Sequence, residues 1–421
     1  MKGEAVSTTG LPGPQGPIHW AWIILAVCFV NLLINYSVRL GYGLVLPEMI
    51  RDLSLSRTAG GTIFNSYFFM YLALTPLTGY LTDWFGARRV ISVCALIMGA
   101  GIILMGTVDS LATACLVFGL VGLGSTGMWT PIISVVLRWF APRRRGLALG
   151  VLSTSWGLGF AALGVTFPWV VHNFNWRFTW YFLGAASLFM VAVNAFLLRS
   201  DPASSGYSPW GQDSGAVSSD STVLLRPRAA HLSQMLKDRT FWLIGLSYMF
   251  TAYGFYGFNT FMVDYARHQV GMPVEKASFL ATVSGLGQVV GVLTILPLSD
   301  RLGRKRALLI ANSFITVLLV GLLFTGQSLV MLYVLVGVLA VFCSATFPMY
   351  SACAGDYFPR EMMATVVGAW TPFYGLGAMA AHWVSGMLRD ATGDYHYPFI
   401  INAFMAGLAV VMMSRVKQAE R

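Results

Sequence analysis

Long apolar runs are the feature that most restricts how this chain can fold. A helix that crosses the hydrocarbon core of a bilayer needs about 20 predominantly apolar residues. Helices also satisfy every backbone polar group within the segment, as lipid requires. We expect twelve such spans, at approximately 20–46, 60–82, 89–107, 111–137, 146–171, 178–198, 241–263, 277–298, 307–325, 329–353, 362–388 and 397–414. The sequence therefore predicts an all-α membrane protein with twelve transmembrane helices.

The composition supports a membrane location for most of the 421 residues. Hydrophobic residues make up 56% of the chain and charged residues 10%, whereas an ordinary soluble protein has about 25% charged residues. The formal net charge of +10 lies almost entirely in tails and loops, so it does not indicate a nucleic acid partner. The five cysteines fall within apolar runs and lack metal-ligand spacing. We expect no metal site and no cofactor.

The distribution of Lys and Arg predicts the orientation of the chain, because cytoplasmic loops are enriched in these residues. With the N-terminus inside, 20 of the 27 lie on the cytoplasmic side, six lie outside, and Arg39 lies within the membrane. We expect a multi-pass protein of the cell membrane with both termini in the cytoplasm. The expected segments are a tail at 1–19, a six-helix half at 20–198, a mobile cytoplasmic linker at 199–240, a second six-helix half at 241–414 and a tail at 415–421.

The two halves contain an internal repeat. The segment Leu81–Arg89 (LTDWFGARR) returns as Leu298–Arg306 (LSDRLGRKR), with 217 positions between Asp83 and Asp300. A second match, at an offset of 218, relates Gly157-Leu158-Gly159 to Gly375-Leu376-Gly377. Parallel repeats of this kind are typical of transporters, whose substrate site lies between the halves near the middle of the membrane.

The segment Gly79–Arg89 resembles the loop 2–3 signature of the major facilitator superfamily. This resemblance covers the chain from about residue 18 to residue 415, and it implies a rocker-switch carrier without an ATP site. It also implies a charge network at the cytoplasmic gate that locks the outward-open state. Alternatively, the basic residues only fix the topology, and the two roles are compatible. The gate residues on the first view are Asp83, Arg88, Arg89, Asp300, Lys305 and Arg306.

Two subgroups of the superfamily share shorter features with this chain. The segment Asn35–Met49 resembles the first span of organic-anion carriers of the anion:cation symporter group, which have an arginine at the place of Arg39. The segment His19–Trp22 is similar to bacterial monocarboxylate-porter relatives. The fourth span, however, lacks the acidic residue of the first subgroup. The eighth span has Gln288 where the second tends to have an acidic residue. Neither subgroup is therefore assigned.

Arg39 is the residue that most strongly indicates the function. An arginine at the centre of a span costs roughly 3 kcal/mol on insertion scales, and no acidic residue lies within a span to pair with it. Seven residues follow before the apolar run ends, so we expect it about 10 Å below the outer boundary. Its helical face also carries Asn35, Tyr36 and Tyr42. Together with Arg39, these side chains could bind a carboxylate. The alternative is an arginine bonded to backbone carbonyls that braces the bundle.

Other spans offer further candidates for the substrate site, although such side chains more often pack than bind. His382 could carry a coupled proton, or it could bond to a neighbouring helix as a neutral group. Asn65, Trp129 and Thr130 are weaker candidates. The main set is Tyr253 and Tyr256 in the seventh span, Gln288 in the eighth, and Tyr374 and His382 in the eleventh.

The sequence thus predicts a monomeric secondary carrier of small organic anions, such as monocarboxylates, that works by alternating access. A coupled proton or counter-anion and the lipid bilayer are its other expected partners. The alternative is a carrier of neutral or drug-like solutes in which Arg39 is structural. A membrane sensor is disfavoured by the duplicated gate loops. An enzyme is disfavoured because no nucleophile, base and orienting group cluster in the sequence.

Overall fold

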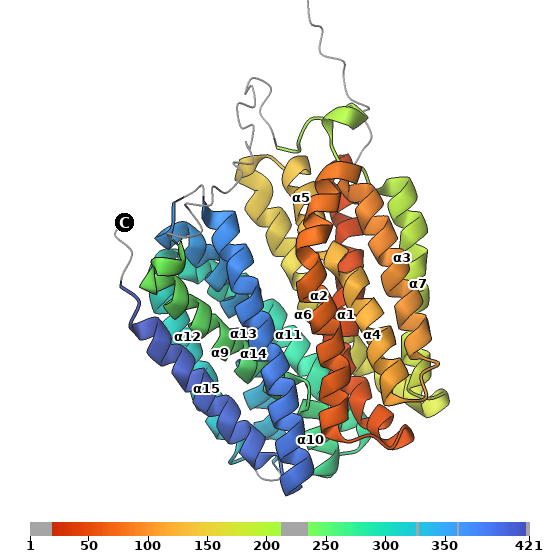
Figure 1. The fold of residues 1–421 in the computed structure, drawn as a ribbon, viewed down its shortest axis with the longest axis vertical. Helices are drawn as coiled ribbons and strands as arrows, with labels where there is room; N and C mark the ends of the chain where they lie inside the picture. The colour runs from red at the N-terminus through yellow and green to blue at the C-terminus, as the bar shows by residue number, and fades with distance from the viewer. Residues whose placement is uncertain (1–18, 212–234, 326–327, 360–361, 418–421) are drawn as a thin grey trace, which may run out of the picture.

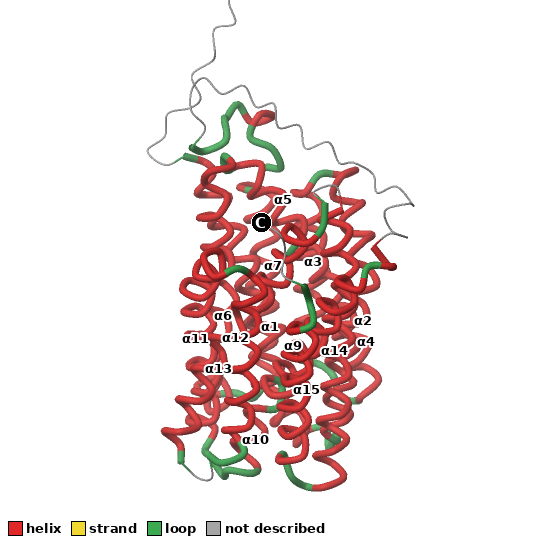
Figure 2. Tube along the Cα trace, turned by 90° about the vertical axis from the view of Figure 1, so that its left-hand side faces the viewer, coloured by secondary structure: helices red, strands yellow, loops and turns green. Residues whose placement is uncertain are grey.

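The computed structural model describes residues 19–211, 235–325, 328–359 and 362–417, and this part of the chain forms a bundle of helices (Figure 1). Short loops connect the helices along the bundle (Figure 2). The predicted all-α fold is confirmed. The tail at 1–18, the linker residues 212–234 and the final residues 418–421 lie outside the described residues.

The helices of the N-terminal half follow the predicted spans closely. They are α1 (Trp20–Asp52), α2 (Arg57–Phe85), α3 (Ala87–Met105), α4 (Leu111–Ser125), the 3₁₀ turn η1 (Thr126–Met128), α5 (Thr130–Trp139), the 3₁₀ turn η2 (Pro142–Arg144), α6 (Arg145–Asn173), α7 (Arg177–Leu197) and the 3₁₀ turn η3 (Ala203–Ser205).

The C-terminal half repeats this pattern. Its helices are α9 (Arg239–Asn259), α10 (Met262–His268), α11 (Val274–Leu302), α12 (Arg304–Leu322), α13 (Leu329–Tyr357), α14 (Met363–Thr392) and α15 (His396–Ser414).

Nine helical segments of the described chain are long and apolar enough to cross a membrane. One of them combines α4, η1 and α5 over Leu111–Trp139. The other three predicted spans correspond to α2, α9 and α14. These helices have 29, 21 and 30 residues, which is long enough to cross a membrane. They are not among the nine because their composition is less apolar. The arrangement is consistent with twelve spans.

Two predicted spans are not continuous helices. The predicted span 111–137 is interrupted by η1 and by Trp129, after which Pro131 occupies the first turn of α5. Proline has no backbone N–H and cannot continue the hydrogen-bond ladder of the preceding helix. The predicted span 241–263 ends early at Asn259, and the short helix α10 follows.

α1 is longer than its apolar run. The helix continues through Pro47 to Asp52. Arg39 is therefore thirteen positions before the last residue of α1, or ~20 Å along the axis. The expected depth of about 10 Å below the outer boundary, measured from the end of the apolar run, stays a prediction, because the length of the helix does not fix the position of that boundary. Arg39 lies near the middle of the bundle.

The halves meet along two helix pairs, α6 with α11 and α2 with α14. The repeated glycines explain this packing. A Cβ on Gly157 would lie 2.2 Å from the carbonyl oxygen of Gly285 on α11. A Cβ on Gly159 would lie 2.7 Å from the carbonyl oxygen of Leu33 on α1. The matching glycines of the C-terminal half are placed in the same way: Gly375 faces α2 of the other half, and Gly377 faces α9 of its own half. One glycine of each pair thus allows contact between the halves and the other allows contact within a half.

The two ends of the bundle can be named from the described residues. We call the end that holds residues 199–211 the linker end, and the opposite end the α10 end (Figures 1 and 2). Both repeated loops turn at the linker end through a glycine with positive φ, 81° at Gly86 and 86° at Gly303. This conformation favours glycine because other residues have a Cβ that clashes there.

Residues 199–211 are packed against the N-terminal half. The ring of Trp210 contacts that of Trp22 with 5.0 Å between centroids, and its backbone N–H donates to the carbonyl of Trp139 at 2.8 Å. Tyr207 contacts Trp20. The expectation of a mobile linker therefore needs correction for this segment, whose aromatic side chains attach it to the bundle.

Candidate functional site

A cavity of about 910 Å³ lies between the two halves. Arg39 lines its deep part, and Leu147 and Asp300 line its exposed part at the linker end. Residues from both halves form the wall, with α1, α2, α5 and α6 on one side and α9, α11, α12, α13 and α14 on the other. The cavity therefore reaches from the middle of the bundle to the linker end.

Arg39 is a buried cation that has no carboxylate partner among the described residues. The residue is 4% exposed, and it takes part in no ion pair of the described chain. One Nη2–H donates to the hydroxyl of Tyr374. Its Nε has no hydrogen-bond partner among the described residues. The guanidinium thus retains donors that a ligand could use.

Aromatic rings surround the guanidinium of Arg39. The distances from Cζ to the ring centroids are 4.6 Å for Phe68, 5.3 Å for Tyr71, 5.5 Å for Tyr374, 5.7 Å for Tyr256 and 5.9 Å for Tyr67. A desolvated cation–π contact contributes about 2 kcal/mol or more. Removing an ion from water costs several kcal/mol even after relaxation. These rings offset part of that cost and leave a positive site in the cavity.

Several predicted site residues lie with Arg39 in the cavity wall. Tyr36 is one turn away on α1, Gln288 comes from α11, and Tyr256 and Tyr374 come from α9 and α14. The hydroxyls of Tyr256 and Tyr374 are 2.5 Å apart, and Tyr374 also accepts from Arg39. The structure thus brings five of the nine predicted substrate-site residues to one cavity.

The other four predicted residues do not line this cavity. The Tyr42 hydroxyl donates to the carbonyl of Gly60 at 2.7 Å, and its ring stacks on Phe64. Asn35 and Tyr253 are buried in the helix packing. Helical spacing placed Tyr42 and Asn35 near Arg39, but neighbouring helices cover that part of the α1 surface.

His382 connects the two halves. Its Nδ1 is 2.8 Å from Oδ1 of Asn65 on α2, and its Nε2 is 3.0 Å from the hydroxyl of Thr260 at the end of α9. The ring is completely buried. Because Asn65 and His382 belong to different halves, this bond requires the halves to be close together at that level.

Sequence reasoning missed several residues of the cavity wall, and gave Trp129 only a minor place. Tyr71, Trp156 and Tyr248 all line the cavity. Each lies in an aromatic-rich helix where many similar residues face lipid or pack, so spacing alone gave no signal for them. Their common feature is the helix pairing, which only the structure provides.

Ion pairs close the two halves at the α10 end. Arg57 of α2 pairs with Asp264 of α10, with 3.2 Å between Nε and Oδ2. Arg267 of α10 pairs with Glu48 of α1. These contacts cross from one half to the other. The α10 end is therefore closed while the linker end is open.

The N-terminus of α2 is capped from the other half. The Asp390 carboxylate of α14 accepts from the backbone N–H groups of Arg57 and Thr58 at 2.9 and 2.8 Å. Burial alone would raise the pKa of Asp390, but hydrogen bonds from Thr58 and from the backbone hold it below its ordinary value. A negative charge is favourable at a helix N-terminus.

Asp264 is held as a carboxylate by its neighbours. Burial alone would raise its pKa, but hydrogen bonds from His268 and Tyr395 and the charge of Arg57 hold the pKa of Asp264 below its ordinary value. The His268 Nδ1 lies 2.8 Å from Oδ1 of Asp264. The carboxylate is therefore charged at neutral pH.

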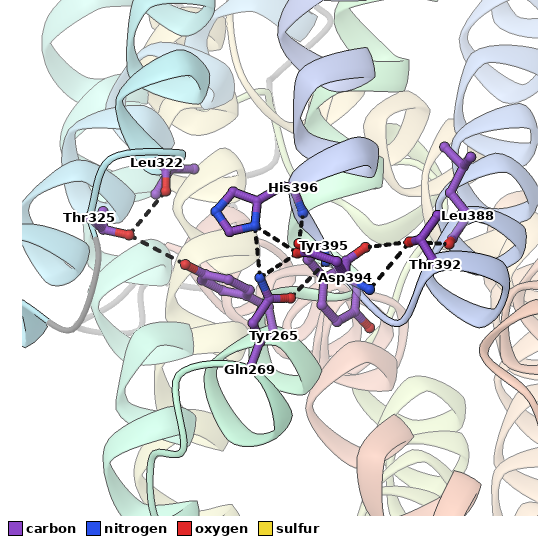
Figure 3. Close-up of polar contacts among 9 residues, drawn as sticks. All are labelled: Tyr265, Gln269, Leu322, Thr325, Leu388, Thr392, Asp394, Tyr395 and His396. Atoms are coloured by element: carbon purple, nitrogen blue, oxygen red, sulfur yellow. Dashed lines mark hydrogen bonds and ion pairs between the residues drawn. The ribbon is translucent and has the colours of Figure 1, made fainter.

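A second polar cluster attaches α10 to its own half (Figure 3). Gln269 donates to Asp394 at 2.6 Å and accepts from the backbone N–H of Tyr395 at 2.7 Å. His396 donates to Asp394 through its backbone N–H at 2.8 Å. α10 is thus bonded to the α14–α15 loop on one side, and its two ion pairs reach the other half.

The predicted gate residues lie at the linker end. Asp300 pairs with Arg304, which the sequence analysis did not select. Arg88 donates through its backbone N–H to the hydroxyl of Ser200 at 3.0 Å, and its guanidinium donates to the carbonyl of Ala195. Within the described ranges no ion pair includes Asp83. The six predicted residues do not form one network in this structure: Asp83, Arg88, Arg89, Asp300, Lys305 and Arg306.

Sequence comparison identifies the family. Residues 25–275 and 244–420 match the Major Facilitator Superfamily, and the chain belongs to this family. It is therefore a multi-pass membrane transporter and not an enzyme.

Individual relatives are similar over nearly the whole chain. A probable sulfoacetate transporter of Cupriavidus necator is 23% identical and covers 92% of each chain. Monocarboxylate transporter 12 of Xenopus laevis is also 23% identical, over 96% of this chain and 90% of its own. Among solved structures, an inward-facing bacterial homologue of the human lysosomal transporter Spinster has a TM-score of 0.70 at 17% identity, and covers 95% of each chain.

Proposed function

We propose that this protein is a secondary carrier of small organic anions whose carboxylate pairs with Arg39. The observation that carries the proposal is a buried guanidinium that faces a cavity and has no carboxylate partner in the described chain. A carboxylate in the cavity would accept a charge-assisted hydrogen bond from the guanidinium. Substrate would thus supply the counter-ion that the described residues do not provide.

The proposed site contains the predicted residues that share the cavity. Tyr256 and Tyr374 would hold the guanidinium in place, and Tyr36 and Gln288 would contact the body of the anion. Asn35, Tyr42, Tyr253 and His382 would support the site from outside it. Two of the similar relatives are named as transporters of sulfoacetate (probable) and of monocarboxylates, both anions, which supports an anionic substrate here.

The orientation follows from charge. We take the linker end as cytoplasmic because 20 of the 27 Lys and Arg residues fall on that side. The cavity then opens to the cytoplasm, and the ion pairs of α10 close the outer side. In the outward-facing state those pairs would separate and the predicted gate residues would close the linker end. Anion binding, by removing an unpaired buried charge, would allow exchange between the states.

The test is transport by the full-length protein in liposomes. Arg39→Ala should reduce uptake of a transported carboxylate by at least tenfold. Arg39→Lys should be intermediate, because an ammonium retains the charge but not the planar pair of donors. Arg177→Ala is the matched control, since Arg177 pairs with Asp52 within one half at the α10 end. Wild-type affinity for carboxylates in correctly inserted Arg39→Ala would refute the proposal.

A carrier of neutral or drug-like solutes is the second candidate. The aromatic residues around Arg39 favour it, because the rings and the Tyr374 hydroxyl already stabilise part of the charge. In that case Arg39→Ala would leave transport of the neutral solute intact, and no carboxylate would compete with it.

A further inference from the structure

We propose that the transported anion carries a single negative charge on a flat aromatic body, and that Tyr36, Trp129 and Trp156 bind this body. We call these three residues the aromatic wall. The inference rests on the proposed function, because Arg39 provides the anchor for the charge. It adds the chemical class of the anion.

The charges of the cavity favour a monoanion. Arg39, Asp300 and Arg304 are the charged residues that line it. Asp300 and Arg304 form an ion pair with each other at the linker end. Arg39 is therefore the one unpaired cation in the described lining. A second negative charge on the substrate would be desolvated without a partner, which is costly.

The Ser and Thr hydroxyls of the lining offer few donors to a strongly polar substrate. Five Ser and Thr hydroxyls in the wall donate to backbone carbonyls of their own helices, three or four residues earlier. Because each hydroxyl has one proton, these groups are donors only if they break such a bond. The five bonds run from Ser153 to Leu149, from Thr154 to Val151, from Ser344 to Val341, from Ser351 to Phe347 and from Thr371 to Val367.

The aromatic wall begins one helical turn from Arg39. Tyr36 precedes Arg39 by three positions on α1, so both project from the same face, with Tyr36 nearer the linker end. The rings of Tyr36 and Trp156 are 5.0 Å apart between centroids, and those of Trp156 and Trp129 are 5.5 Å apart. All three residues line the cavity. An anion held by Arg39 would extend its body along these rings.

Trp156 also has an unused donor. Its indole N–H is buried and has no hydrogen-bond partner among the described residues. A buried indole N–H usually finds a partner. The ring must turn to bring this N–H into the cavity, where a hydroxyl or ether oxygen on the far side of the substrate ring would accept from it. The geometry therefore predicts an aryl monocarboxylate with a polar substituent remote from the carboxylate.

Binding to the purified full-length protein tests this inference. Affinities would be measured at pH 7 for acetate, sulfoacetate, phenylacetate, 4-hydroxyphenylacetate and phenylacetamide. We expect phenylacetate to bind at least tenfold more tightly than acetate or sulfoacetate. The 4-hydroxy compound should bind severalfold more tightly still. The amide, which lacks the charge, should bind at least tenfold more weakly than phenylacetate.

Variants of Trp156 separate stacking from hydrogen bonding. Trp156→Phe should keep the preference for phenylacetate over acetate and lose the advantage of the 4-hydroxyl. Trp156→Leu should lose both preferences while acetate binding still depends on Arg39. Trp169→Leu is the matched control, because Trp169 lies on the same helix and is 59% exposed on the outer surface of the bundle.

The outcomes distinguish this inference from the proposed function. If acetate or sulfoacetate binds through Arg39 as tightly as phenylacetate, the aromatic class is wrong and the anion site stands. If phenylacetate is preferred equally in wild type and in both Trp156 variants, the aromatic wall is not the binding surface. If no anion binds in an Arg39-dependent way, both the inference and the proposed function fail.

Discussion

At the scale of single residues, Arg39 is stabilised less completely than a structural arginine would be. It donates to the hydroxyl of Tyr374 and five rings lie near it, but its Nε is unpaired among the described residues. Removing one partner from a buried ion pair costs about 3–5 kcal/mol, whereas replacing the pair by apolar groups is often neutral. A brace and a binding site therefore respond differently to an apolar substitution.

Arg39→Met should not destabilise the substrate-free protein. Met fills a similar length without a charge, so the substitution removes the cost of an unpaired cation and loses one hydrogen bond. We expect an unfolding free energy within about 1 kcal/mol of wild type. Thermal unfolding in detergent measures it. A loss of several kcal/mol would instead assign Arg39 to bracing the bundle.

Tyr42 should affect stability and not binding. Its hydroxyl donates to the Gly60 carbonyl, and its ring lies away from the cavity. Hydrogen bonds inside membrane proteins contribute about 0.6 kcal/mol on average, up to about 1.7. Tyr42→Phe should lower the unfolding free energy by about this amount and leave anion affinity unchanged. A tenfold loss of affinity in this variant would return Tyr42 to the site.

At the scale of helices, the contact between α6 and α11 depends on glycine. A Cβ on Gly157 would lie 2.2 Å from the Gly285 carbonyl oxygen, whereas a Cβ on Gly150 of the same helix would meet nothing within 4 Å. Gly157→Ala must therefore separate the halves at this point. Overpacking of this kind costs about 1–3 kcal/mol.

The matched pair Gly157→Ala and Gly150→Ala tests that contact. We expect the first to lower thermal stability and to reduce transport severalfold, because the halves no longer fit in the inward-facing state. We expect the second, whose Cβ would enter the cavity and not the contact between the halves, to keep wild-type thermal stability. Equal behaviour of the two variants would show that this helix contact is not important for the fold.

Also at the scale of helices, the short helix α10 holds the two halves together through its ion pairs, and we call this contact the clasp. Asp264→Asn should weaken its bond to Arg57 and shift the protein toward the outward-facing state. Spin-label distances across the α10 end would report this shift. Asp394→Asn is the control, because Asp394 bonds to Gln269 and His396 within one half. Equal distances in both variants would contradict the role of Asp264.

The pKa of Asp264 sets the sign of the pH effect. The folded pKa lies below the ordinary value of 3.8, so the clasp is fully present above that value and weakens as pH falls through the lower, folded pKa. Arg57, His268 and Tyr395 face this carboxylate. Between pH 5 and 8 we therefore expect no loss of outer closure through Asp264. An opening of the α10 end within this range in wild type but not in Asp264→Asn would contradict this.

At the scale of the whole molecule, the sequence predicted the architecture because membrane helices leave strong local signals. Apolar runs marked the helices, and the repeated loops after α2 and α11 marked the two halves. Breaks within helices were missed at Trp129 and Asn259, since a run of apolar residues continues across them. The break at Trp129 comes just before Pro131, a local signal that lies within the apolar run.

The composition of the site was harder to predict than the fold. Arg39 was recognisable because a charge in an apolar run is rare. Trp156 was not, since it is one of 13 tryptophans in the chain. The pairing of Arg57 with Asp264 joins residues 207 positions apart, and no local pattern relates them. The site forms where the halves meet, so its members come from segments that are distant in sequence.

The most direct test of the account is whether carboxylates stabilise the protein through Arg39. Thermal unfolding of wild type and Arg39→Ala would be compared with and without the best-bound carboxylate and its uncharged amide. At a hundredfold excess over the dissociation constant, wild type should gain about 2.7 kcal/mol with the carboxylate, and Arg39→Ala should gain almost nothing. If the variant gains as much as wild type, or the amide acts as well as the carboxylate, Arg39 does not bind the substrate anion.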